Sequence, residues 1–132
     1  ADADQPVIAA GGGGIPVMEQ GSHLKGASAV IEKDRAAGLL AKELDADVLM
    51  FITGVPNVVL NYGSDHPINI DKMTTADAAR YAEEGHFKTG SMLPKVESSI
   101  DFINAGKGRR AIITSLDGAK SALAGKGGTT IQ

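Results

Sequence analysis

Short apolar runs alternate along this chain with segments in which apolar residues recur every three or four positions. The runs predict β-strands, because they are brief and are bounded by glycine or polar residues. They lie at residues 7–10, 48–53, 57–60, 111–114 and 129–131. We expect 57–60 to pair beside 48–53, and 129–131 to be an edge strand. The helical spacing predicts helices over residues 34–45, 74–84, 91–105 and 117–123.

Residues that favour helix starts stand at the beginning of three of these helices. Asp34 is expected to cap the first helix. Thr74 or Thr75 is expected to open the second, where Asp77 would complete a capping box. Ser91 is expected to cap the third helix.

Apolar strands separated by helices imply one α/β domain, built on a mostly parallel sheet that helices cover on both faces. The length of 132 residues suffices for one such domain. Ligands bind at the carboxyl ends of the strands in sheets of this kind. The candidate binding segments are therefore residues 11–14, residues 53–57 and the strand exit at Ser115.

The composition is that of a soluble globular protein. Hydrophobic residues make up 42% and charged residues 22%, and the formal net charge of −3 gives no electrostatic case for nucleic acid or an anionic membrane as partner. The chain has no cysteine, which excludes disulfides and thiolate zinc sites and fits a cytoplasmic location. The longest apolar run, residues 48–52, is too short to span a bilayer, and residues 1–5 lack the order of a signal peptide.

Four consecutive glycines follow the first predicted strand: Gly11, Gly12, Gly13 and Gly14. Their backbone N–H groups, unobstructed by side chains, are suited to hold an anion. The alternative is a tight turn or a hinge that needs positive φ angles. We favour the ligand-binding interpretation, because four glycines carry a high entropic cost for a turn alone. Residues 17–30 contain further glycine breaks and predict an irregular stretch or a hairpin.

Lys95 stands near the start of the helix predicted at 91–105, where a cation is unfavourable. A helix N-terminus carries partial positive charge and unpaired N–H groups, so an anionic ligand would resolve the conflict. Gly90 provides a flexible approach, and Pro94 is tolerated in the first turn because its missing N–H costs no helical bond. The alternative is an ordinary capped helix with a solvated lysine.

Lys33 and Asp34 stand where the irregular segment enters a helix. In a structural interpretation, Asp34 is only a helix cap and Lys33 is its neighbour. In a functional interpretation, Asp34 orients lysine side chains while Lys33 faces a transferred phosphate. These two residues alone do not decide between the interpretations.

Several partial motifs are not supported by their surroundings. The glycine run lacks the third small residue of a dinucleotide-binding fingerprint, because Pro16 stands there and no helix follows. Residues 125–130 resemble part of a phosphate loop, but Lys126 is not followed by serine or threonine. The histidines lack the paired spacing of metal ligands, so no protein metal site is expected from them: His23, His66 and His86.

Four strings, in this order, resemble the carbamate kinases of the amino acid kinase family. They are VIAAGGGGIPV at residues 7–17, AVIEKD at 29–34, TGV at 53–55, and EGHF with GSMLPKVE within 84–97. The resemblance covers nearly the whole of this chain, but it covers only the C-terminal half of the members of that family. It implies a three-layer α/β/α sandwich with a mostly parallel central sheet. Residues 1–132 would be its single ATP- or ADP-binding lobe, without the N-terminal substrate lobe.

The resemblance also implies an activity, which is reversible phosphoryl transfer between ATP and carbamate. It implies ATP or ADP with Mg²⁺ as cofactors, carbamate or carbamoyl phosphate as substrate, and a cytoplasmic homodimer at full length. The implied catalytic residues are Lys33, Asp34 and Lys95. The implied phosphoryl and substrate loop consists of Gly11, Gly12, Gly13 and Gly14. The implied nucleotide-binding residues are Thr53, Gly54, Val55, Tyr62, Gly90, Ser91, Met92 and Lys95.

Two other functions stay open at this point. The chain could bind an adenine nucleotide without catalysis, as a regulatory or interaction module. It could also belong to another amino acid kinase that forms an acyl phosphate, such as one acting on acetylglutamate. The strings GGGGIPV and SMLPKVE favour carbamate kinase over that enzyme. If the chain is part of a carbamate kinase, it is expected in isolation to bind ADP or ATP without making ATP from carbamoyl phosphate.

Overall fold

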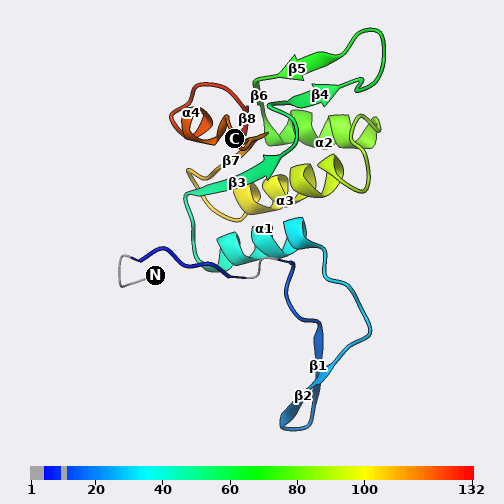
Figure 1. Cartoon of the computed structure of the whole chain (residues 1–132), viewed down its shortest axis with the longest axis vertical. Helices are drawn as coiled ribbons and strands as arrows, with labels where there is room; N and C mark the ends of the chain where they lie inside the picture. Colours follow the sequence, from blue (N-terminus) through cyan, green and yellow to red (C-terminus); the bar gives the residue numbers. More distant parts are fainter. Residues whose placement is uncertain (1–4, 10–11) are drawn as a thin grey trace.

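The computed structural model describes residues 5–9 and 12–132, which build a mixed α/β fold around a four-stranded sheet (Figure 1). The strand order is β3 (Val48–Thr53), β7 (Arg110–Ser115), β8 (Thr129–Ile131) and β6 (Lys72–Met73). β3 pairs with β7 and β6 with β8 in parallel, whereas β7 and β8 are antiparallel. The predicted mostly parallel sheet is confirmed. β8 is not the predicted edge strand, because β6 pairs with its other side.

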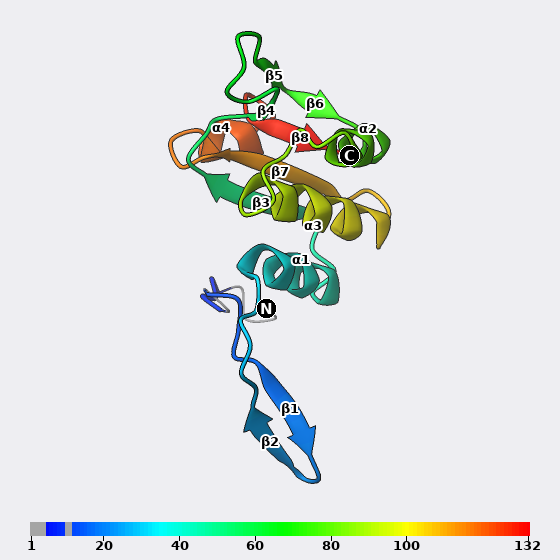
Figure 2. The ribbon, with the colours of Figure 1, turned by 90° about the vertical axis from the view of Figure 1, so that its right-hand side faces the viewer.

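The helices lie on both sides of β7. They are α1 (Lys33–Glu43), α2 (Thr75–Glu83), α3 (Met92–Asn104) and α4 (Ala119–Leu123). Ala111 and Ile113 of β7 are buried in the main core with α2 and α3, whereas Thr114 lies against Gly118 before α4. α1 packs mainly on α3, and Figure 2 shows it beyond α3 as seen from the sheet. None of the helices in the described residues is long and apolar enough to cross a membrane.

The segment after β3 does not pair beside it, so that prediction is wrong. β4 (Val58–Leu60) instead forms a separate antiparallel pair with β5 (Ile68–Ile70). Hydrogen bonds near the end of the chain hold it there. The Asn57 side chain donates to the carbonyl oxygen of Gly128 at 2.9 Å, and the Val58 N–H donates to Thr129 Oγ1 at 2.7 Å.

β1 (Val17–Gln20) and β2 (His23–Gly26) form an antiparallel hairpin that projects from the rest of the fold (Figure 1). The hairpin interpretation of this segment is therefore confirmed. The strand predicted at 7–10 is wrong for residues 7–9, which form no strand, and residue 10 lies outside the described residues. A strand needs a neighbour to satisfy its backbone groups, and no strand in the described part of the chain pairs with this run.

The predicted cap of α2 is confirmed, whereas the predicted cap of α3 is not. Thr74 caps α2 and forms the predicted capping box, because Thr74 and Asp77 each accept the other's backbone N–H through their side chains. Ser91 occupies the position before α3 but makes no side-chain cap bond. The backbone N–H of Ser91 donates instead to the Lys88 carbonyl oxygen at 3.2 Å.

The start of α1 differs from the prediction. Glu32 caps this helix, with its carboxylate accepting the backbone N–H of Arg35 at 2.8 Å, and Asp34 lies inside the first turn. Glu32 has the extended backbone that a cap requires. Desolvation raises the pKa of Glu32, but hydrogen bonds from two backbone N–H groups and the Lys33 ammonium outweigh it and hold the pKa below its ordinary value of 4.5.

We expect Glu32→Gln to remove part of the acid sensitivity of the fold. A carboxylate with a lowered folded-state pKa stabilises the fold above its unfolded-state value, and this stabilisation disappears as the pH falls through the folded-state value. The wild-type chain should therefore lose stability more steeply than the variant between about pH 5 and 3, in urea unfolding at successive pH values. Glu83→Gln, at an exposed position in α2, is the matched control. Equal pH slopes for wild type and Glu32→Gln would contradict this account.

Candidate functional site

The N-termini of α1 and α3 lie side by side. Asp34 in α1 pairs with Lys95 in α3, and about one turn further along, Gly38 abuts Ser98, so the two helices run in the same direction. Figure 1 shows both helices starting on the same side of the fold. The partial positive charges of two helix N-termini therefore add at this end of the molecule. An arrangement of this kind favours an anion.

Asp34 and Lys95 form a buried ion pair. Lys95 Nζ lies 2.6 Å from Asp34 Oδ2, and the side chains are only 8% and 7% exposed, respectively. A second hydrogen bond joins Lys95 Nζ to the carbonyl oxygen of Ser91 at 3.4 Å, and the ring centroid of Phe51 in β3 is 5.9 Å away. Because an ammonium has three N–H donors, one donor of Lys95 has no acceptor within residues 5–9 and 12–132, and we call it the free donor.

Lys33 places a second ammonium on the solvent side of this pair. Its Nζ lies 3.5 Å from Asp34 Oδ2 and 3.4 Å from Glu32 Oε1, and its side chain is 58% exposed. Coulombic attraction to Asp34, together with the hydrogen bond to Glu32, raises the pKa of Lys33 above its ordinary value. The structure therefore brings Lys33, Asp34 and Lys95 together, with one carboxylate between two ammonium groups.

The glycine loop approaches the start of α1. Gly13 has a φ of 114°, and a Cβ at this position would overlap the carbonyl oxygen of Ile31 and lie 3.2 Å from the backbone nitrogen of Lys33. Gly13 is therefore required by packing within the chain. Gly12 and Gly14 have open space where a side chain would stand, and Gly11 lies outside the described residues.

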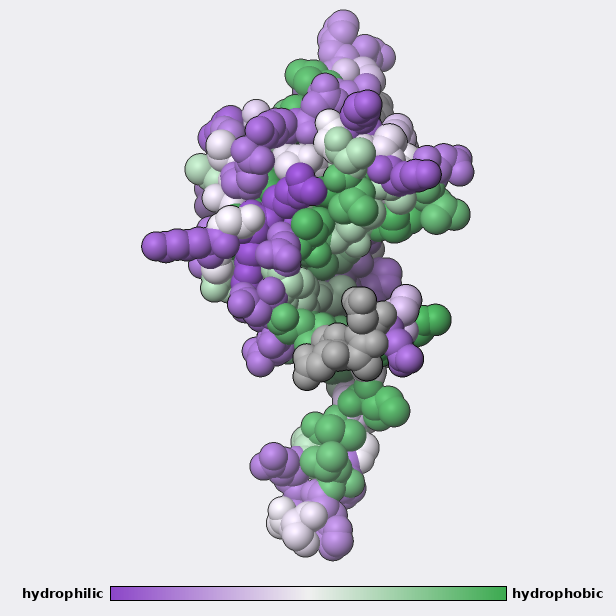
Figure 3. All heavy atoms as spheres, turned by 90° about the vertical axis from the view of Figure 1, so that its left-hand side faces the viewer, coloured by the Kyte–Doolittle hydropathy of each residue, from purple (hydrophilic) through white to green (hydrophobic). Residues whose placement is uncertain are grey.

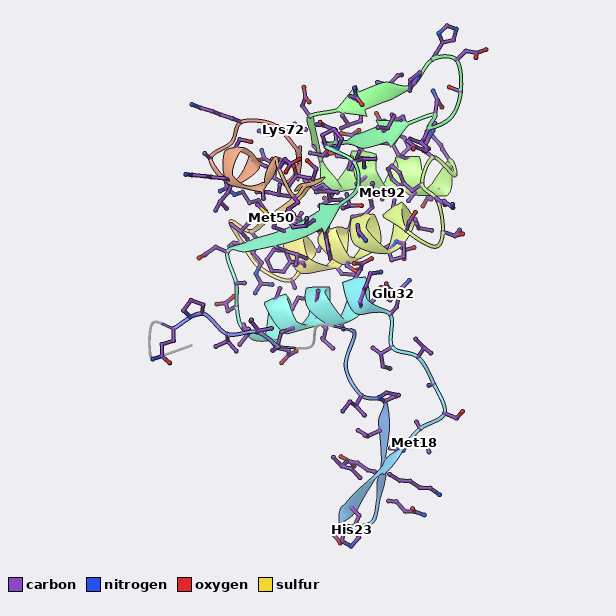
Figure 4. All side chains as sticks on the ribbon, viewed as in Figure 1. Met18, His23, Glu32, Met50, Lys72 and Met92 are labelled. Carbon is purple, nitrogen blue, oxygen red and sulfur yellow. The ribbon has the colours of Figure 1, made fainter. Side chains whose placement is uncertain are left out.

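A cavity of about 310 Å³ opens at the carboxyl end of β3, where sheets of this kind bind ligands. Figure 4 labels one of its residues, Met92, at the start of α3. The predicted nucleotide-binding residues that line it are Thr53, Gly54, Val55, Tyr62, Ser91 and Met92. Gly90 and Lys95, which were also predicted, are not among the lining residues.

His86 and Lys88 also line this cavity, and the sequence analysis assigned no ligand-binding role to them. His86 is held by a 3.2 Å contact between its Nε2 and the Glu84 carboxylate and by edge-on packing against Tyr81, with ring centroids 5.7 Å apart. A search for metal-ligand spacing could not find these residues. Their position in the sequence could have indicated them. They lie in the loop just before α3, and a loop that leads into a cavity-lining helix places its own side chains at the same opening.

Ser91 connects the cavity to the ion pair, because it lines the cavity and its carbonyl oxygen accepts a hydrogen bond from Lys95. An apolar hollow with hydrogen-bonding groups thus lies next to a cluster of cations. This arrangement suits a ligand with a flat ring at one end and negative charge at the other. A larger cavity of about 710 Å³ lies near the start of β7, at the opposite end of the sheet, and none of the predicted catalytic or nucleotide-binding residues lines it.

Known proteins resemble this chain closely in sequence. A sequence profile of the amino acid kinase family matches residues 2–115. The carbamate kinase-like protein YqeA of Escherichia coli (strain K12) is 51% identical over 130 residues, which make up 98% of this chain and 42% of that protein. The carbamate kinase of Thermococcus kodakarensis is 50% identical over 125 residues, which make up 95% of this chain and 39% of that protein.

A solved structure agrees with this relationship. The carbamate kinase from Giardia lamblia bound to AMP-PNP superimposes with a TM-score of 0.86 and 42% sequence identity, over 91% of this chain and 38% of that one. The resemblance to carbamate kinases is therefore confirmed, for a chain that spans about two fifths of the length of these relatives. The chain belongs to the amino acid kinase family, and within that family it is homologous to carbamate kinases.

Proposed function

We propose that this chain is the C-terminal, nucleotide-binding part of a carbamate kinase, which transfers a phosphoryl group reversibly between ATP and carbamate. The observation that carries the proposal is the continuity between the cavity after β3 and the cluster of Lys33, Asp34 and Lys95. The relative from Giardia lamblia, bound to AMP-PNP, supports an adenine nucleotide as the ligand.

The adenine and ribose would occupy the cavity. Val55, Tyr62 and Met92 provide apolar and aromatic surface against which a purine ring can pack. Thr53, at the end of β3, provides a hydroxyl for polar contacts. A volume of about 310 Å³ falls at the lower end of the range typical of small-molecule sites.

The phosphates would lie at the N-termini of α1 and α3. A phosphoryl group in transfer spreads negative charge over its oxygens, so catalysis depends on positioned cations and N–H donors. Lys33 and the free donor of Lys95 provide the cations, and the backbone of Gly12 and Gly14 provides N–H groups. Asp34 acts on the lysines rather than on the substrate, because its carboxylate holds both ammonium groups in place.

Mg²⁺ is expected to accompany the nucleotide. Within residues 5–9 and 12–132, no group of three or more histidine, aspartate or glutamate side chains is placed to hold a metal. This fits Mg²⁺, which commonly keeps several waters and is held by nucleotide phosphates rather than by an all-protein cage. When bound, the ion neutralises phosphate charge.

The groups that hold carbamate or carbamoyl phosphate are expected in a second lobe. Most of the exposed large apolar side chains lie in the first third of the chain, and Figure 3 shows apolar side chains on the body and along the hairpin. We propose that this surface faces the substrate lobe of the complete protein, which is a cytoplasmic homodimer. This chain would form the three-layer α/β/α sandwich of the nucleotide-binding lobe. The exposed side chains are Val7, Ile8, Ile15, Val17, Met18, Leu24, Val30, Ile31, Leu39, Leu40 and Leu44.

We expect Lys95→Met to weaken ADP binding by about 1.5–3 kcal/mol in calorimetry, because it removes a charge-assisted contact to phosphate. The same change leaves the Asp34 carboxylate buried without its partner. It should therefore also lower the free energy of unfolding by about 3–5 kcal/mol.

A double variant separates these two effects. Asp34→Asn combined with Lys95→Met removes both charges, so it should recover most of the stability and still bind ADP weakly. Lys107→Met, at an exposed position beyond the far end of α3, is the control for the loss of one positive charge. ADP affinity equal to wild type in the double variant would show that Lys95 does not contact the phosphates.

We expect the isolated chain to bind ADP or ATP without making ATP from carbamoyl phosphate above the uncatalysed rate. Orientation of two reactants accounts for about 7–11 kcal/mol of barrier lowering, and this chain is proposed to hold only one of them. Adding the part of the Thermococcus kodakarensis carbamate kinase that this chain does not match should restore ATP synthesis, followed by luminescence.

Asp34→Asn is the control in that mixture, where it should reduce ATP synthesis by orders of magnitude. ATP synthesis by the wild-type chain alone would contradict the assignment of the substrate groups to a second lobe. ADP binding with no synthesis in the mixture would favour a non-catalytic nucleotide-binding module.

A further inference from the structure

A second contact between α1 and α3 lies beside the buried ion pair. Gly38 is buried in α1, and a Cβ at this position would lie 3.0 Å from the Ser98 Cβ and 3.4 Å from the Ser98 carbonyl oxygen. Figure 2 shows the two helices next to each other, with α3 between α1 and the sheet. Glycine lowers the stability of a helix interior relative to alanine, so its presence here has a packing reason.

This contact is on the same helix faces as the ion pair. Gly38 follows Asp34 by four residues and Ser98 follows Lys95 by three, and both spacings keep side chains on one face of a helix. The separation of the backbones at Gly38 and Ser98 therefore limits how far the Asp34 carboxylate must reach to Lys95.

A third contact holds the helices together on the solvent side of the same turns. Arg35 donates to the Glu97 carboxylate at 2.6 Å, and both side chains are partly exposed. The Arg35–Glu97 attraction and the small Gly38 position both favour a short distance between α1 and α3. No hydrogen-bond partner for the buried hydroxyl of Ser98 is found in the described part of the chain. The hydroxyl therefore does not hold the two helices together, and the shape of the contact does.

We infer that Gly38 and Ser98 are positioning residues for Lys95, which set the distance between α1 and α3 so that Asp34 holds the ammonium in place for nucleotide phosphate. Neither residue contacts the ligand. A Cβ at Gly38 would push α3 away by a few tenths of an ångström and would re-aim the free donor of Lys95. The nucleotide part of this inference rests on the proposed function, whereas the positioning of Lys95 by Asp34 does not.

The test is a set of variants at these two positions. Gly38→Ala should bind ADP about tenfold more weakly than wild type, which is about 1.4 kcal/mol. Its melting temperature should change little, because the higher helix propensity of alanine offsets the cost of the tighter contact with Ser98. Ser98→Gly added to Gly38→Ala removes the Cβ that causes the overlap and should restore the affinity. Ser98→Ala, which keeps the Cβ and removes only the hydroxyl, is the matched control and should bind ADP as wild type does.

Crystal structures give a readout that does not depend on nucleotide. The distance between Asp34 Oδ2 and Lys95 Nζ, which is 2.6 Å in the wild type, should lengthen by a few tenths of an ångström in Gly38→Ala and should return to the wild-type value in the double variant. A Gly38→Ala variant with wild-type ADP affinity and an unchanged Asp34–Lys95 contact would overturn the inference, and so would weak binding that Ser98→Gly fails to restore. If Gly38→Ala alone does not fold, the double variant must fold and bind ADP, and its failure would equally overturn the inference. A wild-type chain that binds no ADP would instead contradict the proposed function, while the measured distances still test the positioning.

Discussion

The buried ion pair of Asp34 and Lys95 is the interaction on which the candidate site depends. It joins two helices whose partially positive N-termini lie at the same end, and it holds one ammonium against Ser91, which lines the cavity. Replacing a buried ion pair by apolar residues of similar volume is often neutral or stabilising, whereas losing one partner costs about 3–5 kcal/mol. Stability alone therefore does not account for the pair. The proposed role, in which the pair places a cation for a ligand, would account for it.

The position of Lys95 at a helix N-terminus shows what can be predicted from charge in a sequence and what cannot. The conflict between a cation and a helix N-terminus predicts a nearby anion, and the structure supplies one in the Asp34 carboxylate. The alternative of a solvated lysine is wrong, because the side chain is only 8% exposed. Charge reasoning from Lys95 alone could not identify the partner, which lies 61 positions away and depends on how α1 packs on α3. The functional interpretation of Asp34, in which it orients lysine side chains, did anticipate the contact. The anionic ligand itself stays a prediction, which the free third donor of Lys95 permits.

The sequence predicts an element correctly where neighbouring residues determine its structure. The errors occur where contacts with a distant segment determine how a strand pairs. The capping box of Thr74 and Asp77 depends on four consecutive residues and is correct. The strand predicted at 57–60 is held away from β3 by hydrogen bonds to Gly128, just before β8, and to Thr129, the first residue of β8. No local sequence pattern contains these contacts. β8 was predicted as an edge because its neighbour β6 has only two residues, too few to leave a periodic signal.

Packing and backbone conformation explain some of the glycines in the glycine loop but not all of them. Gly13 is needed because a side chain would overlap Ile31, and Gly14 has a φ of 91°, which favours glycine in itself. Gly12 has neither reason, because its φ lies outside the left-handed region and a Cβ there would meet nothing within 4 Å. Interactions within the described chain therefore leave this one glycine unexplained. Close approach of a phosphate, or of a second lobe to the start of α1, would require it, and the proposed function expects both.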